Sequence, residues 1–122
     1  MGLIQMKRGE IYFADLDPAV GNETQKRRPV LIVSNNANNR AAETITVVPI
    51  TSNITKVYPF EVLLDSKETG LLKSSKAQCH QVRTISKTRI KTLKPVGSVN
   101  ASMSKIHAAL ILHLDLSVGL PR

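Results

Sequence analysis

Short strand-like segments separated by turn signals constrain the fold of this chain more than any other feature. Six segments rich in Val, Ile and Thr alternate with turn dipeptides such as Asp-Pro, Gly-Asn and Ser-Asn, a pattern typical of β-strands joined by short loops. The strands that we expect are Glu10–Ala14, Val30–Ser34, Thr44–Ile50, Phe60–Leu64, Gln78–Ile85 and Pro95–Val99. With only one convincing helix besides, this pattern predicts a small α+β domain built on a strongly curled antiparallel sheet or barrel.

Two of the expected strands carry further information. Val30–Val33 is continuously apolar, which predicts a strand that is buried on both faces. Pro49 interrupts the strand-like run TITVVPI. Because proline has no N–H to donate to a neighbouring strand, it predicts a sheet edge or a bulge at that position.

The convincing helix is near the end of the chain, after a candidate N-cap at Asn100. Two shorter segments, residues 37–42 and residues 86–91, can each form a single helical turn. The apolar residues that recur at helical spacing in the longer helix are Met103, Ile106, Leu110 and Leu114.

A length of 122 residues suits one domain. We expect it to span residues 6–116, between an N-terminal extension of residues 1–5 and a C-terminal tail of residues 117–122. Cys79 is the only cysteine, which excludes an intrachain disulfide and favours a reducing compartment. The sequence has neither a signal-peptide pattern nor an apolar run long enough for a bilayer. These features predict a cytoplasmic protein that does not contact a membrane.

Positive charge dominates the composition. Seventeen Lys and Arg residues against nine Asp and Glu residues give a formal net charge of +8, which suggests a polyanionic partner such as nucleic acid. A basic, solvated surface without a ligand is the alternative. No acidic residue occurs between Glu68 and Asp115. The basic residues of that stretch are Lys73, Lys76, Arg83, Lys87, Arg89, Lys91, Lys94 and Lys105.

The common catalytic and metal-binding patterns are missing from the sequence. His80, His107, His113 and Cys79 have no metal-ligand spacing, and the glycines do not form a phosphate loop. On a strand, the adjacent Cys79 and His80 would point to opposite faces, which prevents a nucleophile–base pair. We therefore expect no metal and no cofactor, with Cys79 in the core and the two helix histidines in structural roles.

Three consecutive cations, Lys26, Arg27 and Arg28, directly precede Pro29 and the buried strand. They form either a solvated loop or an anion site whose cation is held by a rigid strand. Further polar residues follow other expected strands, and adjacent strand ends would bring them together as a pocket that suits a phosphodiester, for chemistry or for binding alone. The pocket residues are Glu23, Arg28, Thr51, Ser52, Gln81 and Arg83, the last two facing the same way on one strand.

Tyr58 and Phe60 bracket a proline in an expected loop. A ring in such a loop can stack on an unstacked nucleic-acid base. Tyr58 is the better candidate for this contact, because Phe60 can equally belong to the core.

The segments MKRGEIYFADLDPAVGNE, RRPVLIVSNN, VVPITS and QVRTI occur in this order before the apolar C-terminal helix. Together they resemble the MazF/PemK family of toxins from bacterial toxin–antitoxin systems, over residues 6–115. The resemblance implies a small SH3-like antiparallel β-barrel with short helices, assembled as a homodimer. It implies a metal-independent endoribonuclease that cuts single-stranded RNA at short sequences, gives a 2′,3′-cyclic phosphate and a 5′-hydroxyl, and inhibits growth by blocking translation. It also implies a cognate antitoxin whose acidic, extended tail lies in the RNA groove.

The resemblance further implies roles for single residues. Arg28 and Thr51 match the family's usual catalytic pair, and Glu23 matches the loop acid, which would orient Arg28 or take the proton of the 2′-hydroxyl. The chain departs from the family pattern where TQKR replaces loop glycines and where His80 replaces an acid, so the resemblance does not define its base preference. The expected RNA-binding residues are Lys26, Arg27, Ser52, Tyr58, His80, Gln81 and Arg83.

Two other functions fit parts of the sequence. A toxin of the same fold can inhibit a protein target such as DNA gyrase, but that function would need neither the Arg28–Thr51 pair nor the high net charge. An RNA-binding module without catalysis would use the charge but not the pair. Incubation with a long single-stranded RNA in EDTA separates these three functions.

Overall fold

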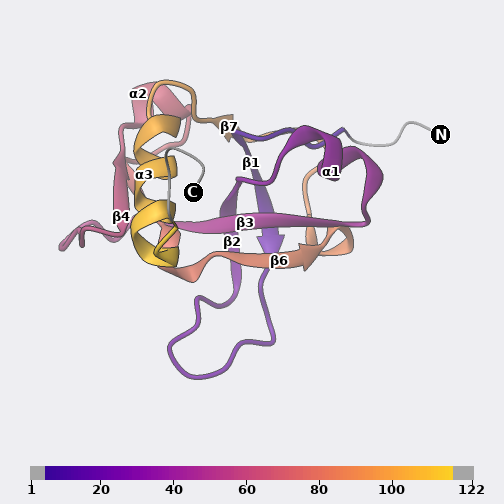
Figure 1. The fold of residues 1–122 in the computed structure, drawn as a ribbon, viewed down its shortest axis with the longest axis horizontal. Coiled ribbons are helices and arrows are strands. Elements are labelled where there is room, and N and C mark those ends of the chain that lie inside the picture. Colours follow the sequence, from indigo (N-terminus) through magenta and orange to yellow (C-terminus); the bar gives the residue numbers. More distant parts are fainter. Residues whose placement is uncertain (1–4, 117–122) are drawn as a thin grey trace, which may run out of the picture.

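Seven strands, three α-helices and two short 3-10 turns are found in residues 5–116, the part of the chain that the computed structural model describes (Figure 1). Apart from Gln5, the expected N-terminal extension and C-terminal tail lie outside the described residues. The strands are β1 (Glu10–Asp15), β2 (Arg27–Ile32), β3 (Thr44–Thr51), β4 (Glu61–Leu64), β5 (Ser75–Gln78), β6 (Arg83–Ser86) and β7 (Gly97–Ser98). The helices are α1 (Asn36–Ala41), α2 (Ser66–Thr69) and α3 (Met103–Leu114), and the 3-10 turns are η1 (Cys79–Gln81) and η2 (Lys87–Arg89).

The sheet curls around β3. One edge of β3 pairs with β2 through Val47–Pro49, and the other edge pairs with β6 through Thr44–Val47 and with β5 through Ile50–Thr51. One edge of β1 pairs with β2, and its other edge pairs with β7 at Glu10 and Ile11 and forms a bridge from Ala14 to Ile90, which follows β6. The antiparallel pairings run from β1 through β2 and β3 to β6, and the segment after β6 returns to β1, so the prediction of a curled, barrel-like α+β fold is confirmed.

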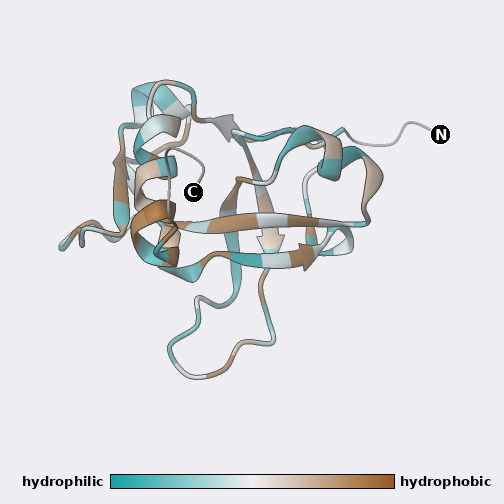
Figure 2. Ribbon diagram, viewed as in Figure 1, coloured by the Kyte–Doolittle hydropathy of each residue, from teal (hydrophilic) through white to brown (hydrophobic). Residues whose placement is uncertain are grey.

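Alternate strand residues enter two apolar clusters on opposite faces of the sheet. Val30 and Ile32 belong to one cluster, and Leu31 and Val33 belong to the other, so the prediction that this run is buried on both faces is confirmed. Helix α3 covers the second cluster through the buried side chain of Ile106. Figure 2 shows the hydrophobic residues of β3, which contributes to both clusters.

The prediction of a sheet edge or a bulge at Pro49 is wrong, because this residue lies inside β3 and pairs with Val30 of β2. On the opposite edge of β3, pairing with β6 stops at Val47 and pairing with β5 begins at Ile50. Pro49 therefore lies where one edge of the strand changes partners. A residue without an N–H is tolerated in such a gap, because the gap requires no ladder hydrogen bond.

The single strand expected over Gln78–Ile85 is also wrong, because the chain forms the end of β5, the turn η1 and then β6. Both strands pair with the same edge of β3, but their registers differ by three residues. The three residues of η1 take up this difference. Extra residues of this kind leave the ladder and redirect side chains, often beside active sites.

Two short elements were not predicted, and one cap was misplaced. β5 and α2 have four residues each, too few to leave a periodic signal. Helix α3 begins after Ser102, not after Asn100, and Ser102 provides no side-chain cap. Glu68 of α2 caps the helix instead, accepting hydrogen bonds from the amides of Asn100 and Ser102 at 3.1 and 2.8 Å and from the Ser102 hydroxyl at 2.6 Å.

The single turns expected near residues 37–42 and 86–91 are present as α1 and η2. Within residues 5–116, no helix combines the length and the apolar character that a membrane crossing needs.

Candidate active site

The register of β2 and β3 relates the two residues expected to form the catalytic pair. The pairing of β2 with β3 ends at Val30 and Pro49, and Arg28 and Thr51 each lie two residues beyond this last pair on their own strand. Arg28 on β2 and Thr51 on β3 therefore lie at the same end of these two paired strands.

Both side chains of this pair keep hydrogen-bonding groups available. The Nε of Arg28 donates to the carbonyl of Gln25 at 3.0 Å, and its two terminal nitrogens make no hydrogen bond within residues 5–116. The Oγ1 of Thr51 accepts from the amide of Asn53 at 3.2 Å, so its own proton can still be donated. A planar guanidinium and a hydroxyl donor held in this way can bind two oxygens of one phosphate.

A cavity of about 280 Å³ is lined by Pro49 of β3, two residues before Thr51, but neither Arg28 nor Thr51 is among its lining residues. Its walls come from three segments: the loop of residues 16–26, the middle of β3, and the chain from η1 to β6. Of the six residues of the predicted pocket, Glu23, Gln81 and Arg83 line this cavity, whereas Arg28, Thr51 and Ser52 do not. The residues of the wall that matter here are Glu23, Thr24, Pro49, His80, Gln81 and Arg83.

The side chain of Glu23 is not beside Arg28 in this conformation. Its Oε1 accepts a hydrogen bond from the amide of Val20 at 2.6 Å, and its own amide donates to the Val20 carbonyl at 3.2 Å. Glu23 therefore stabilises the turn at the tip of the 16–26 loop while it lines the cavity.

Gln81 and Arg83 hold the 16–26 loop in place. Gln81 accepts from the Thr24 amide at 3.3 Å and donates to the Asn22 carbonyl at 3.2 Å. Arg83 donates from Nη1 to the carbonyl of Leu16 at 3.3 Å. The prediction that Gln81 and Arg83 face the same way on one strand is wrong, since Gln81 belongs to η1 and Arg83 begins β6. Both residues line the cavity, Gln81 from the 3-10 turn η1 between the two strands and Arg83 from the start of β6.

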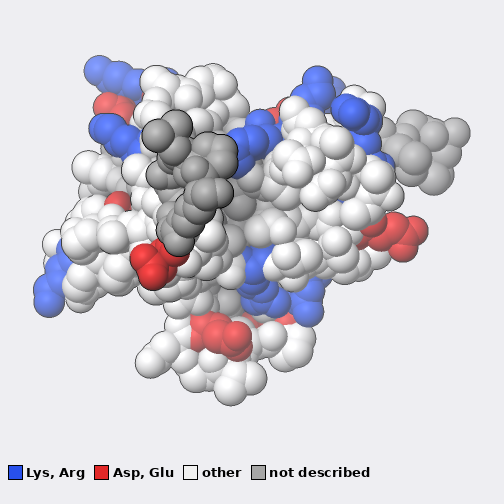
Figure 3. All heavy atoms as spheres, in the orientation of Figure 1, with Lys and Arg blue, Asp and Glu red and all other residues white. Residues whose placement is uncertain are grey.

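Basic side chains flank the loop. Lys26 is exposed and has a positive φ of 71°, and its amide donates to Oδ1 of Asp17 at 2.9 Å. Arg27 is exposed and its Nη2 lies 3.5 Å from the carbonyl of Lys91. Figure 3 shows basic side chains where the loop joins the body of the protein and acidic side chains on the loop itself. The charge is thus positive at the strand end that carries Arg28.

His80 is held in the cavity wall with one nitrogen unsatisfied. Its Nδ1 is buried and has no hydrogen-bond partner within residues 5–116. Burial lowers the pKa of its imidazole, while the nearby Glu61 acts in the opposite direction. The ring packs against Phe60, with centroids 4.4 Å apart. A neutral imidazole at neutral pH follows from this environment.

The remaining expected contacts lie outside the cavity. Ser52 is exposed just after β3, and Tyr58 is exposed in the loop that leads to β4. Phe60 is half-buried and packs between rings, not in either apolar cluster. The sequence did not reveal the roles of Thr24 and Gln78, whose side chains join the loop to β5 at 2.9 Å, because their contact spans 54 residues of chain.

Cys79 is buried, and burial together with the nearby Glu61 raises the pKa of its thiol to about 12. The predicted core role of Cys79 is confirmed. Across residues 5–116, no three His, Cys, Asp or Glu side chains cluster in a way that could hold a metal ion.

The curled sheet and its basic, polar end are those of a small toxin domain: the chain belongs to the PemK-like, MazF-like toxins of type II toxin–antitoxin systems, whose sequence profile matches residues 7–114. It is 50% identical over 117 residues to the endoribonuclease MazF9 of Mycobacterium tuberculosis, covering 91% of this chain and 98% of that protein. It is 40% identical over 112 residues to the endoribonuclease EndoA of Bacillus subtilis, covering 91% and 96%. A solved mycobacterial endoribonuclease, in complex with its cognate antitoxin, superposes with a TM-score of 0.75 at 27% identity, covering 93% of this chain and 99% of that chain.

Proposed function

We propose that this toxin is a sequence-specific endoribonuclease that cleaves single-stranded RNA, with residues 6–116 as the functional unit. The observation that carries the proposal is that the paired strands β2 and β3 carry Arg28 and Thr51 just beyond their last pair, Val30–Pro49, and that Pro49 lines a polar cavity. Two relatives at 50% and 40% identity are named endoribonucleases, which supports it.

The proposed reaction uses the RNA's own nucleophile. The 2′-hydroxyl attacks the adjacent phosphorus, the bond from phosphorus to the 5′ oxygen breaks, and the products are a 2′,3′-cyclic phosphate and a 5′-hydroxyl. The protein then needs only to position the phosphodiester and stabilise the charge that develops on its oxygens. The reaction requires no metal, because side-chain donors supply this stabilisation.

Arg28 is assigned to the developing charge and to the leaving oxygen, and Thr51, with Ser52, to a non-bridging oxygen. Arginine is a poor general base because its pKa lies far above neutral pH. Glu23 is assigned to the orientation of Arg28 or, less favoured, to proton acceptance. Since the Glu23 carboxylate is engaged by the Val20 amide, either role requires the loop to move.

The remaining assignments concern the path of the RNA. Lys26 and Arg27 are exposed beside the pair and contact flanking phosphates. His80 and Gln81 project into the cavity from η1 and contact bases there. One nitrogen of Arg83, Nη1, donates to the Leu16 carbonyl, and the other N–H donors of its guanidinium are assigned to RNA. Tyr58 contributes an exposed ring outside the cavity.

The proposal includes a homodimer in the cytoplasm, neutralised by an antitoxin whose acidic, extended segment occupies the RNA site. A solved relative in complex with its cognate antitoxin supports this partner, and the exposed cations suit an acidic chain. Cleavage of messenger RNA would block translation and inhibit growth. Light scattering at micromolar concentration should give the mass of a dimer, and a monomer mass would contradict this part.

The experiment that tests the function is incubation of the purified protein with a long single-stranded RNA in excess EDTA. We expect discrete cleavage products whose 5′ ends accept phosphate from polynucleotide kinase without prior phosphatase treatment. Binding without cleavage would indicate an RNA-binding module, and inhibition of DNA gyrase without cleavage would indicate a protein-directed toxin. Activity that is lost in EDTA and restored by a divalent ion would refute the metal-independent mechanism.

A further inference from the structure

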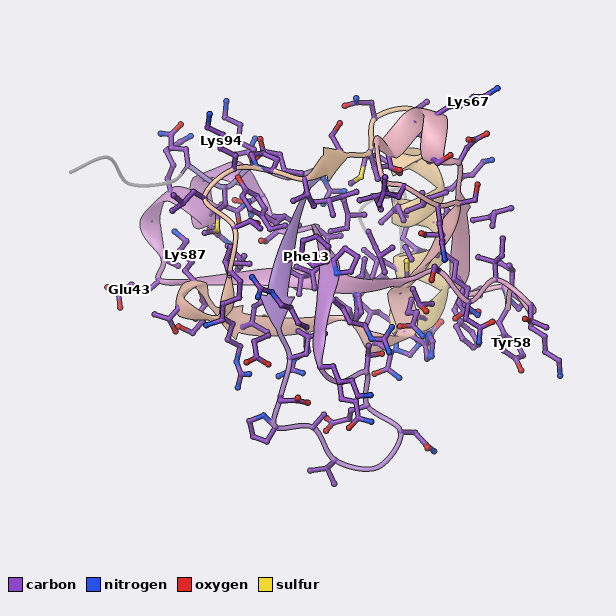
Figure 4. The ribbon with its side chains drawn as sticks, turned by 180° about the vertical axis from the view of Figure 1, so that it is seen from behind. Phe13, Glu43, Tyr58, Lys67, Lys87 and Lys94 are labelled. Atoms are coloured by element: carbon purple, nitrogen blue, oxygen red, sulfur yellow. The ribbon has the colours of Figure 1, made fainter. Side chains whose placement is uncertain are left out.

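Three rings form a row that leads from the cavity wall to the protein surface. His80 lines the cavity, and its ring centroid lies 4.4 Å from that of Phe60. Phe60 and Tyr58 are stacked, with centroids 5.5 Å apart and planes within 8°. Tyr58 is 48% exposed and forms the outer end of the row, where Figure 4 shows it pointing away from the body of the protein.

A buried ion pair fixes the loop that carries this row. Lys76 of β5 lies 3.0 Å from Glu61 of β4, and the two side chains are only 10% and 2% exposed. The Nζ of Lys76 also donates to the carbonyl of Lys56 at 2.6 Å. The same Glu61 oxygen accepts from the amide of Tyr58 at 3.0 Å. The pair therefore binds the backbone of the loop at two points, next to Tyr58.

Stability alone does not account for such a pair. Burying two charges is costly, and apolar residues of similar volume often serve the fold equally well, so a buried pair is better understood as specifying one conformation. Here that conformation is the one in which the Tyr58 ring stacks on Phe60. The Lys76 ammonium lies 5.9 Å from the Tyr58 ring centroid, and Phe60 stacks on the same ring. The Tyr58 side chain is nevertheless half-exposed, so part of it remains accessible to a ligand.

We propose that the Tyr58–Phe60–His80 row is a stacking subsite for one unpaired base of bound RNA, and that the Lys76–Glu61 pair positions it. The choice of RNA as the ligand rests on the proposed function, because the row begins at the cavity where RNA would bind. A flat, half-exposed ring held rigid beside a basic surface suits a nucleobase, because every base has a face that can stack on it. The exposed end of the subsite, Tyr58, lies outside the cavity and would extend the length of RNA that the protein recognises.

The test compares RNA ligands that lack one base at a time. Cleavage sites are first mapped on a long RNA, and an oligonucleotide with that site is then made with a 2′-O-methyl group that blocks attack. When the missing base is the one that would stack in the subsite, the wild-type protein should lose roughly tenfold in affinity for the RNA. Tyr58→Ala should bind the intact RNA about tenfold more weakly and should lose nothing further at that position. Tyr58→Phe keeps the ring and should behave as wild type.

A matched control is Leu93→Ala, which removes another exposed apolar side chain and should respond to every abasic position as wild type does. The subsite is refuted if each abasic position costs Tyr58→Ala as much affinity as it costs the wild-type protein. Failure to cleave any RNA contradicts the proposed function instead, so the two failures can be told apart.

The positioning role is tested with Lys76→Met combined with Glu61→Gln, which removes both charges and keeps an acceptor for the Tyr58 amide. This variant should raise KM for RNA about tenfold, the cost of one lost stacked base, and change kcat less than twofold. Adding Tyr58→Ala should then have no further effect, because the two changes act on one element. Additive losses would refute positioning. The abasic comparison on Tyr58→Ala decides the subsite even if the charge-free variant does not fold.

Discussion

Arg28 combines a fixed backbone with a side chain that can change partners. Its backbone belongs to β2, directly before a strand segment that is buried on both faces. Among the described residues, its guanidinium makes one hydrogen bond, to the carbonyl of Gln25. A cation held in this way can meet a phosphate without much reorganisation, which is what stabilisation of a transition state requires.

Arg28→Ala should therefore reduce the single-turnover rate of RNA cleavage by about 10²–10³, corresponding to ~3–4 kcal/mol, while RNA affinity changes only a few-fold. Arg28→Lys should restore little, since an ammonium cannot donate to two phosphate oxygens in a plane. Thr51→Val should cause a similar or smaller loss. Arg40→Ala on α1 is the matched control and should cleave normally. A parallel loss of affinity and rate would show that Arg28 only binds.

The place of a candidate site residue in the fold was predictable where the residue directly adjoins a strand with a clear apolar pattern. Arg28 and Thr51 adjoin strands with strong apolar patterns, so their positions followed from strand order. Gln81 lines the cavity, but the sequence did not indicate that its amide also holds a loop 57 residues away. The burial of Lys76 likewise depends on Glu61 and on β5, a strand too short and polar to predict. Contacts between distant segments leave no local pattern.

Among the secondary-structure elements, α2 and α3 depend on each other through Glu68. Its carboxylate accepts three hydrogen bonds from Asn100 and Ser102 at the start of α3. The hydrogen bond from the Ser102 hydroxyl, followed by that from the Ser102 amide, lowers the pKa of Glu68. A lowered pKa means that folding favours the carboxylate, so its contribution is present above the ordinary pKa and is lost as pH falls through the folded value.

Glu68→Gln should lower the free energy of unfolding by about 1 kcal/mol at pH 7. The difference from wild type should shrink below about pH 4.5, the ordinary value for this carboxyl, and should vanish below the lowered pKa. Urea unfolding of both proteins between pH 7 and pH 3 measures this difference. Glu43→Gln is the control, since the Glu43 side chain makes no hydrogen bond within residues 5–116. A difference that stays constant over this pH range would contradict the capping role.

The existence of the strands and of the long helix was predictable because their apolar patterns are local. The split between β5 and β6 was not, because it arises from a three-residue register difference on the shared edge of β3. Alternation within Gln78–Ile85 is equally consistent with one strand. Only the pairing partner reveals the interruption.

At the scale of the whole molecule, only some of the residues behind the net charge of +8 lie close enough to the candidate site to contact bound RNA. Lys26 and Arg27 are placed beside Arg28, whereas Lys67 and Lys94 lie at the end of the molecule away from the 16–26 loop (Figure 4). Each cation that contacts a phosphate releases counterions on binding, so affinity for RNA should fall steeply with salt.

Replacing Lys26 and Arg27 with Ala should flatten the slope of log affinity against log salt by about one unit or slightly more, since each contact on single strands contributes roughly 0.7. The cleavage position should stay the same. The charge-matched control, Lys67→Ala with Lys94→Ala, should leave the slope unchanged. Fluorescence anisotropy with a 2′-O-methyl RNA provides the measurement, and an altered cleavage position would mean that Lys26 or Arg27 reads bases.

The three residues of η1 separate the part of the chain that maintains the sheet from the part that faces the cavity. Cys79 is buried, but His80 and Gln81 stand between the β5 and β6 pairings with β3 and carry no ladder pairing themselves. Exchanging these two side chains would remove no residue from a strand pairing, but a change at Gln81 would release its hydrogen bonds to the 16–26 loop. If His80 and Gln81 contact bases as proposed, relatives could diverge in RNA preference at these positions while keeping the pairings of the sheet.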